Sequence, residues 1–556
     1  MPRWILWTLL AAYAFAGLFG RDPWYQDDAA GFGLMWTMAS GSWADWLLPN
    51  VFGAVIAEEG PLPFWVGAAF VHLFEPLLGA AVAARLTTLL WLILATASLW
   101  YATYRLARRE EAQPVAFVFG GEAGPRDYGR MLADMAVLLL LATVGIAPKL
   151  HETTAESAAV AWIALTLYGV ARVLDNAGGG ALLTGCAIAA LALSRGLAPA
   201  VLLLVAVTAV ALGQRRWRSA AIIATVAIGV AALWPLLALT LLPQRAAPYF
   251  SAWLLWNTQT LSVPGLAELT RIARNLPWYT WPLWPLALWA LYSWRHALHA
   301  PHMALPATIA AALLLRLLLA NAPGEEKLIL LVPPLVVLAA FGATSLPRGA
   351  ANALDWFAIA GASFVALALW SYYVAAHTGV PPKMAHSVVR LTPNFRYEVV
   401  APLLGLALSA TAAWIALVVW RVQTRPPMLW RGPLLNAAAV VFLWTIANAL
   451  FLGPLNHARS YANTARLVAE QLTGAANGGC VVAHHLLPAD RALFAWHGGL
   501  RFVAPEHEEA CPLALHRDRK RSPLDDAPPP GRWELIWEGP GPIRRDETYR
   551  VYRRTG

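Results

Sequence analysis

The sequence predicts an all-α polytopic membrane protein of about 13 transmembrane helices, followed by a small α/β domain. Two observations carry this fold class. Hydrophobic residues make up 59% of the 556 residues and charged residues only 13%, whereas soluble domains carry roughly 25% charged residues. Apolar runs of about 20 residues, the length that crosses a bilayer, also recur until the chain turns polar near its C-terminal end.

The apolar runs give the order of the spans along the chain. Residues 1–20 have an apolar core without a clear cleavage site, so we expect an uncleaved first span. Several prolines interrupt residues 61–79, which we expect to form juxtamembrane or re-entrant helices on the outer side. With that segment excluded, Arg-rich and Arg-poor loops alternate along the chain, and the Arg-rich loops fall on the inner side. The other spans are expected near 82–104, 131–148, 156–173, 180–194, 196–212, 219–241, 280–294, 303–321, 328–346, 355–376, 399–420 and 434–453.

The net charge of +9 does not indicate a nucleic-acid partner. Most of the arginines lie in short loops between spans, where they set membrane topology. The sequence also contains no P-loop, GxGxxG unit, GxSxG elbow or CxxC pair. Nucleic-acid binding and nucleotide chemistry on the inner face are therefore not expected.

Residues 454–556 form a polar tail that follows the membrane part, 1–453. Cys480 and Cys511 both lie in this tail. Two interpretations stay open: the cysteines form a disulfide in an oxidising compartment, or they are unrelated free thiols. An expected helix at 488–497 is accompanied by β-like runs near 480–483, 500–503, 533–537 and 549–552. The sequence therefore predicts a small α/β domain, of ordinary size for an independent unit.

Two acidic pairs, Asp27-Asp28 and Glu58-Glu59, lie in the loop 21–79 beside the expected outer surface. Carboxylates next to a bilayer are costly to desolvate, so those that occur tend to be functional. They can deprotonate an acceptor hydroxyl or bind a divalent cation. Purely structural roles stay open as alternatives. Asp27-Asp28 could be a helix cap or a topology signal, and Glu58-Glu59 could be a solvated loop pair.

Further charged residues lie at the outer ends of later spans. A turn after the span 131–148 holds an imidazole and carboxylates that could act as metal ligand or general base, or be merely solvated. Cations at later span ends could snorkel, whereas Arg316, over a turn inside its span, would be stabilised by a phosphate or an acidic partner. The residues concerned are His151, Glu152, Glu156, Arg195, Arg316 and Lys327. The aromatic-rich loop 243–279 is expected as an interfacial segment or a lid.

Short motifs occur in a recognisable order along nearly the whole chain, although each is weak alone. They are Asp27-Asp28 after the first span, EEGPLPFW at 58–65, Ala83-Ala84-Arg85-Leu86, Arg195-Gly196, Lys327-Leu328 before Pro333-Pro334, Arg459-Ser460-Tyr461 and the Trp-rich run 533–537. In this order they resemble the GT-C glycosyltransferases, specifically the bacterial aminoarabinose-transferase-like and protein-mannosyltransferase-like group. The resemblance implies the GT-C type of membrane fold.

The chain departs from the family pattern at three places. The family has an Arg shortly after its first acidic pair, where this chain has Ala29-Ala30-Gly31, and a Lys where this chain has Glu59. The second outer turn carries an Asp in the family, and here Glu152 or Glu156 must take its place. These departures leave the sugar and the acceptor undefined.

What the resemblance implies is an inverting transfer of a sugar from a polyprenyl phosphate, such as undecaprenyl phosphate, to a lipid, glycan or protein acceptor. The reaction would occur at the periplasmic face of a bacterial inner membrane, as in lipid A or cell-envelope glycosylation. Asp27 would be the general base or would orient the acceptor, with Asp28 and Glu58 as further catalytic groups. Substrate would be bound by His151, Glu152, Glu156, Arg195, Arg316 and Lys327, the cations neutralising the leaving phosphate. Whether a divalent metal takes part is left open, with Asp28, Glu58 and His151 as candidate ligands.

Other classes of protein remain as alternatives. A secondary transporter predicts charged pairs near the bilayer midplane and helices broken at corresponding positions of two halves, whereas the acids here gather on the outer side. A GT-C-like scaffold without catalysis is motivated by the missing Arg and Lys. An O-antigen ligase or polymerase would also use lipid-linked sugars, but its large loop is expected late in the chain.

Overall fold

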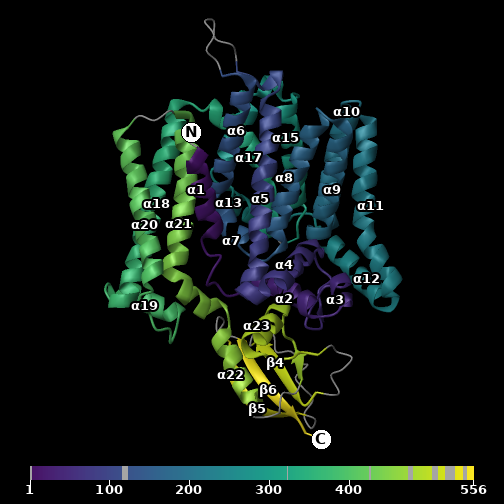
Figure 1. Cartoon of the computed structure of the whole chain (residues 1–556), viewed down its shortest axis with the longest axis vertical. Helices are drawn as coiled ribbons and strands as arrows, with labels where there is room; N and C mark the ends of the chain where they lie inside the picture. Colours follow the sequence, from purple (N-terminus) through teal and green to yellow (C-terminus); the bar gives the residue numbers. More distant parts are fainter. Residues whose placement is uncertain are drawn as a thin grey trace.

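A slab of long helices carries a small α/β domain at one end, which we call the sheet end (Figure 1). The N-terminus lies toward the opposite end of the slab. The computed structural model describes residues 3–114, 123–321, 324–424, 428–473, 480–503, 511–519, 533–541 and 547–555. The predicted fold class, a polytopic helical protein with a small C-terminal sheet domain, is confirmed.

Within these described ranges, nine helical segments are long and apolar enough to cross a membrane. They are α5 (Ala80–Ala107), α8 (Ala155–Val173), α9 (Ala177–Arg195), α11 (Trp217–Leu241), α15 (Pro301–Leu318), α16 with α17 (Glu325–Thr344), α18 (Arg348–Thr378), α20 (Ala401–Gln423) and α21 (Met428–Arg459) with its continuation. Together, α6 (Pro125–Leu141) and the segment Val144–Leu150 also meet this criterion, and their bend of 58° fits a broken span or a re-entrant loop. That segment contains α7 (Ala147–Leu150).

Three expected spans are shorter than the rule of about 20 residues assumes. These are α1 (Arg3–Phe15), α10 (Leu197–Gly213) and α14 (Leu283–Ser293), with 13, 17 and 11 residues. They lie where the apolar runs predict them, and their brevity explains why fewer than about thirteen segments meet the length criterion. The proline-interrupted segment forms α4 (Leu62–Leu78), which lies at the sheet end as expected (Figure 1).

Small residues let neighbouring helices of the slab approach closely. A Cβ on Gly169 of α8 would lie 2.5 Å from Thr184 Oγ1 of α9, and a Cβ on Gly180 would lie 2.4 Å from the Val173 nitrogen. Such close backbone approach is typical of helices packed within a membrane. The two helices thereby form a rigid pair whose ends, at Glu156 and Arg195, both reach the sheet end.

Shorter elements connect the spans. At the sheet end lie α2 (Asp27–Ser40), α3 (Trp43–Leu47) and α12 (Pro243–Gln259), together with α19 (Pro382–Leu391) (Figure 1). A small hairpin of β1 (Asn50–Val51) and β2 (Ala54–Val55) follows α3, and α13 (Leu266–Tyr279) follows α12. The 3-10 turns are η1 (Glu110–Ala112), η2 (Val144–Ile146), η3 (Arg295–Ala297) and η4 (Ile329–Leu331).

The tail folds as a four-stranded sheet in the order β3-β4-β6-β5. Its elements are α22 (Ala462–Thr473), β3 (Val481–His484), α23 (Pro488–Gly498), β4 (Leu513–Arg519), β5 (Trp533–Pro540) and β6 (Glu547–Arg554). β3 and β4 pair in parallel across α23, and the other pairs are antiparallel. Cys480 and Cys511 form a disulfide just before β3 and β4. The expected run at 500–503 contributes only a single bridge, between Phe502 and Val481.

The tail domain is packed onto the slab. Ala29 of α2 belongs to the same hydrophobic cluster as Phe494 of α23 and Tyr549 of β6. Trp496 of α23 makes edge contacts with Phe32 and Trp36 of α2. This shared core fixes α23 against the first turns of α2, which is where the candidate site begins.

Candidate functional site

A cavity of about 620 Å³ opens at the sheet end, between the slab and the tail domain. Its walls come from α2, the loop before α4, the facing ends of α8 and α9, α12, α15 and α16, and the start of α23. Six of the nine predicted site residues line it: Asp27, Glu58, Glu156, Arg195, Arg316 and Lys327. Residues from Gln26 to Ala489 therefore surround one charged cavity.

Asp27 begins α2 and presents its carboxylate to the cavity. Its side chain is 65% exposed, and one oxygen lies 3.0 Å from the Lys149 ammonium. The same ammonium lies 3.0 Å from Glu152 and is itself 12% exposed. Lys149 thus contacts Asp27 while leaving most of that carboxylate accessible, and a general base must be accessible to its substrate.

Asp28, the next residue, is buried and faces away from the cavity. Its Oδ2 accepts hydrogen bonds from Arg21 (2.8 Å) and the Trp24 amide (3.1 Å). Its Oδ1 accepts two from Thr153, through the amide (2.7 Å) and the hydroxyl (2.9 Å). Burial alone would raise the pKa of this carboxyl, but Arg21 and Arg85 hold it below its ordinary value. The predicted catalytic role of Asp28 receives no support from this position.

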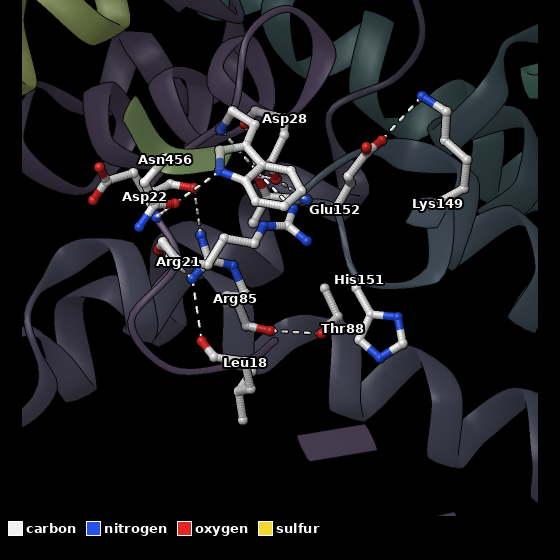
Figure 2. A network of polar contacts seen from close by, with 12 residues as sticks. Leu18, Arg21, Asp22, Asp28, Arg85, Thr88, Lys149, His151, Glu152 and Asn456 are labelled. Carbon is white, nitrogen blue, oxygen red and sulfur yellow. Dashed lines mark hydrogen bonds and ion pairs between the residues drawn. The ribbon is translucent and has the colours of Figure 1, made fainter. Parts of the chain in front are cut away.

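Asp28 belongs to a buried group that we call the clasp, made of Arg21, Asp28, Arg85 and Thr153. Figure 2 shows Arg21, Asp28 and Arg85 of this group. Arg85 of α5 is 1% exposed and donates to the carbonyls of Leu18 (3.1 Å), Arg21 (2.8 Å) and Asp22 (3.3 Å). Arg85 therefore gives the Ala-Ala-Arg-Leu motif a physical role. It ties the segment before α2 to the slab, while Asp28 ties the first turn of α2 to the turn before α8.

The last turns of α21 hold the same segment from the other side. The Asn456 side chain accepts from the Asp22 amide (3.1 Å) and the Trp24 indole (2.9 Å) and donates to the Gly20 carbonyl (2.8 Å). Tyr461, in the Arg-Ser-Tyr motif, stacks on Tyr25 with ring centroids 4.6 Å apart. The orientation of Asp27 is thus set from both ends of the chain.

Arg195 ends α9 at the cavity wall, where Gly196 breaks the helix with φ +79°. A Cβ on Gly196 would lie 2.6 Å from Asn257 of α12, so the Arg-Gly motif requires glycine at this turn. The Arg195 guanidinium pairs with Glu59 and lies 3.3 Å from Glu156. It also donates to the Glu326 carbonyl (3.4 Å).

Arg316 of α15 differs from Arg195 in its partners. It is 5% exposed and lines the cavity, yet its hydrogen bond is a long one to the Thr260 carbonyl, at 3.4 Å. Across the part of the chain that the structure describes, Arg316 forms no ion pair with a carboxylate. Lys327 in contrast lies 2.8 Å from Glu326. Arg316 is the buried cation best placed to receive an anion.

His151 and Glu152 lie behind the cavity wall. The two ring nitrogens of His151 face the carbonyls of Ala147 (2.6 Å) and Tyr13 (2.7 Å), which leaves neither for a ligand. Burial raises the pKa of the Glu152 carboxyl, although its pair with Lys149 opposes the rise. The prediction that His151 or Glu152 contacts substrate directly receives no support from these positions.

The candidate metal ligands Asp28, Glu58 and His151 do not meet. Glu58 lines the cavity, whereas the oxygens of Asp28 and the nitrogens of His151 are engaged elsewhere. Among the described residues, no group of three or more His, Cys, Asp or Glu side chains could hold a metal ion. These three residues therefore do not fit a shared metal, and no step is derived through one.

Several residues of the cavity wall were not assigned a role from the sequence. Glu59 and Glu326 pair with the cations, and Trp256 and Thr260 of the aromatic-rich segment complete the wall. One signal could have pointed to Glu59, since it stands where the family has a Lys. Glu326 and Trp256 carry no comparable signal, because their roles depend on contacts distant in sequence.

The fold is that of the GT-C glycosyltransferases, which confirms the predicted resemblance at the level of fold. The crystal structure of ArnT from Cupriavidus metallidurans bound to undecaprenyl phosphate matches with a TM-score of 0.68 at 16% identity, over 99% of this chain and 97% of ArnT. The apo form of ArnT matches with a TM-score of 0.67 at 17% identity, over the same shares.

A weaker similarity extends to the archaeal oligosaccharyltransferase AglB from Archaeoglobus fulgidus, in complex with an inhibitory peptide and a dolichol-phosphate. It matches with a TM-score of 0.48 at 10% identity, over 92% of this chain and 69% of AglB. No protein-family model and no curated protein sequence matches the chain.

Proposed function

We propose that this protein is a membrane glycosyltransferase that moves a sugar from a polyprenyl-phosphate donor to a lipid, glycan or protein acceptor. The observation that carries the proposal is the cavity itself, where an accessible carboxylate, Asp27, shares one chamber with a buried cation, Arg316, that forms no ion pair with any described carboxylate. The ArnT structure bound to undecaprenyl phosphate supports the choice of donor.

The chemistry is a single displacement at the anomeric carbon. The acceptor hydroxyl oxygen forms a bond to that carbon while its proton passes to Asp27, and the carbon–oxygen bond to phosphate breaks. The bonding electrons leave on the phosphate, whose charge Arg316 and Lys327 offset. Because one displacement occurs, the anomeric configuration inverts. Glu58 and Glu156 are proposed to orient the sugar hydroxyls.

We further propose that the sheet end faces the periplasm of a bacterial inner membrane, with residues 1–453 as the membrane domain and 454–556 as the periplasmic domain. Two observations support this. Arg105, Arg108 and Arg109 gather at the opposite end of α5, as the positive-inside rule expects for a cytoplasmic end. The disulfide between Cys480 and Cys511 suits an oxidising compartment.

The proposal is tested by incubating the detergent-purified protein with a panel of sugar-linked polyprenyl phosphates and measuring release of free polyprenyl phosphate. Asp27→Asn should lower release by at least about a hundredfold, since it removes the proton acceptor. Glu75→Gln, which removes an exposed carboxylate of α4 outside the cavity, is the matched control and should retain release. Lipid binding without release from any donor would favour the scaffold alternative, and absence of lipid binding would favour the transporter.

A further inference from the structure

The cavity wall holds more carboxylates than cations, and this excess of negative charge opposes the binding of an anionic donor. Five carboxylates line the cavity, from Asp27, Glu58, Glu59, Glu156 and Glu326, against the three cations Arg195, Arg316 and Lys327. A phosphate that approaches Arg195 meets two carboxylates already paired with that guanidinium. Like charges within a few ångströms repel strongly where water is scarce. Donor binding must therefore rearrange at least one of these pairs.

Of the two carboxylates on Arg195, that of Glu59 is the one placed to move. Its side chain is 24% exposed, whereas that of Glu156 is 5% exposed and lies in the first turn of α8. Rotation about the side-chain torsions would carry the Glu59 carboxylate toward the open cavity. Glu156 has less freedom, because its side chain is almost fully buried at the first turn of α8.

The backbone at Glu59 is held in position, whereas its side chain is 24% exposed. Glu59 has φ +50°, in the left-handed region that a non-glycine residue rarely adopts. Its carbonyl accepts from the Trp253 indole, and the next amide, Gly60, donates to the Ser194 carbonyl at 3.2 Å. A Cβ on Gly60 would lie 2.2 Å from the Leu193 backbone. An unfavourable conformation kept by its surroundings is a feature of functional sites.

From these contacts we infer that Glu59 is a displaceable counter-ion for Arg195 that sets the affinity for the donor phosphate. Without donor, the carboxylate of Glu59 occupies the guanidinium. The phosphate first meets Arg316 and then replaces Glu59 on Arg195. This inference rests on the proposed function and makes Glu59 a specificity-determining residue, because only a ligand with an anionic group strong enough to displace a carboxylate would engage both arginines.

The test measures binding of undecaprenyl phosphate alone, without turnover, to purified variants. Glu59→Gln keeps the size of the side chain and can still accept a hydrogen bond from Arg195, but it lacks the charge. We expect it to bind at least about tenfold more tightly than the wild type. Glu75→Gln should bind as the wild type does, which controls for the loss of one negative charge elsewhere at the sheet end.

A double-mutant cycle decides whether the effect passes through Arg195. In an Arg195→Gln background, which removes the cation that Glu59 neutralises, the gain from Glu59→Gln should shrink to less than about twofold. An equal gain in both backgrounds would show a general charge effect and overturn the inference, as would equal affinities of Glu59→Gln and wild type. If no variant binds the lipid phosphate, the proposed function fails together with the inference. Thermal unfolding of each variant checks the fold. Glu59→Ala should, like Glu59→Gln, bind undecaprenyl phosphate more tightly than the wild type.

Discussion

The clasp and the cavity use the same kinds of charged residue in opposite ways. In the clasp, Asp28 receives four hydrogen bonds at 2.7–3.1 Å and is 2% exposed. In the cavity, Asp27 has one cationic neighbour and is 65% exposed, and Arg316 has a single long bond to a carbonyl. The two aspartates are adjacent in sequence and belong to the same helical turn.

The difference shows how this structure separates support from chemistry. A buried charge whose hydrogen-bonding capacity is filled by the protein has little left to offer a ligand. A charge whose capacity is only partly filled, beside a cavity, can bind or react. Saturation by partners therefore distinguishes Asp28 of the clasp from Asp27 and Arg316 of the site.

Asp28→Asn should have the largest effect on the fold. The new side-chain NH2 group would face the N–H groups of either Arg21 or Thr153, so two hydrogen-bond donors would oppose each other. Arg21 would also lose its carboxylate partner. Breaking a buried pair by removing one charge costs about 3–5 kcal/mol. We expect a large fall in the thermal unfolding temperature and loss of activity together. A variant that keeps wild-type stability but loses activity would mean that Asp28 acts in catalysis and that saturation does not separate the two groups.

Arg316→Ala should have the opposite profile, with the fold kept and transfer lost. Since Arg316 makes only one weak contact, its removal leaves no carboxylate unpaired among the described residues. Removing a group that stabilises charge in a transition state lowers turnover by about 10²–10³. Polyprenyl-phosphate release at saturating donor measures this, alongside thermal unfolding.

The matched control for Arg316→Ala is Arg274→Ala, which removes an exposed cation of α13 outside the cavity. It should leave turnover and stability unchanged. Arg316→Lys should recover part of the turnover, because a point charge remains without the planar guanidinium. A large loss of stability in Arg316→Ala would place Arg316 with the clasp instead.

Much of the fold could be predicted from the sequence because hydrophobic runs respond to the bilayer directly. The spans lie where those runs occur, and the proline-interrupted α4 stays at the sheet end. Which aspartate faces the cavity could not be predicted in this way. That choice depends on the bonds between Asp28 and Thr153, which are 125 positions apart.

The charge balance of the site was likewise beyond sequence reasoning. The cations Arg195, Arg316 and Lys327 could be singled out one by one, because charges at span ends are rare and costly. Their partners could not, since Glu59 and Arg195 are separated by 136 positions and meet only when the loop before α4 packs on α9.

Asn456→Ala should have the smallest effect of the three substitutions on stability and turnover. It tests whether a neutral residue helps to hold the segment that leads into α2. The substitution removes two hydrogen bonds accepted from Asp22 and Trp24 and one donated to Gly20. Unpaired groups of this kind cost about 1–3 kcal/mol where water cannot reach them. Because the segment that leads into α2 would still be held by Arg85, Asp28 and the Tyr25–Tyr461 stack, we expect a modest drop in unfolding temperature and a fall in turnover at unchanged affinity for the lipid phosphate. Asn463→Ala, which alters an exposed contact to His457 nearby, should change neither quantity. A variant of Asn456 that weakens lipid binding as strongly as turnover would show that the α21 end shapes the cavity itself, so that support and site would not be separable there.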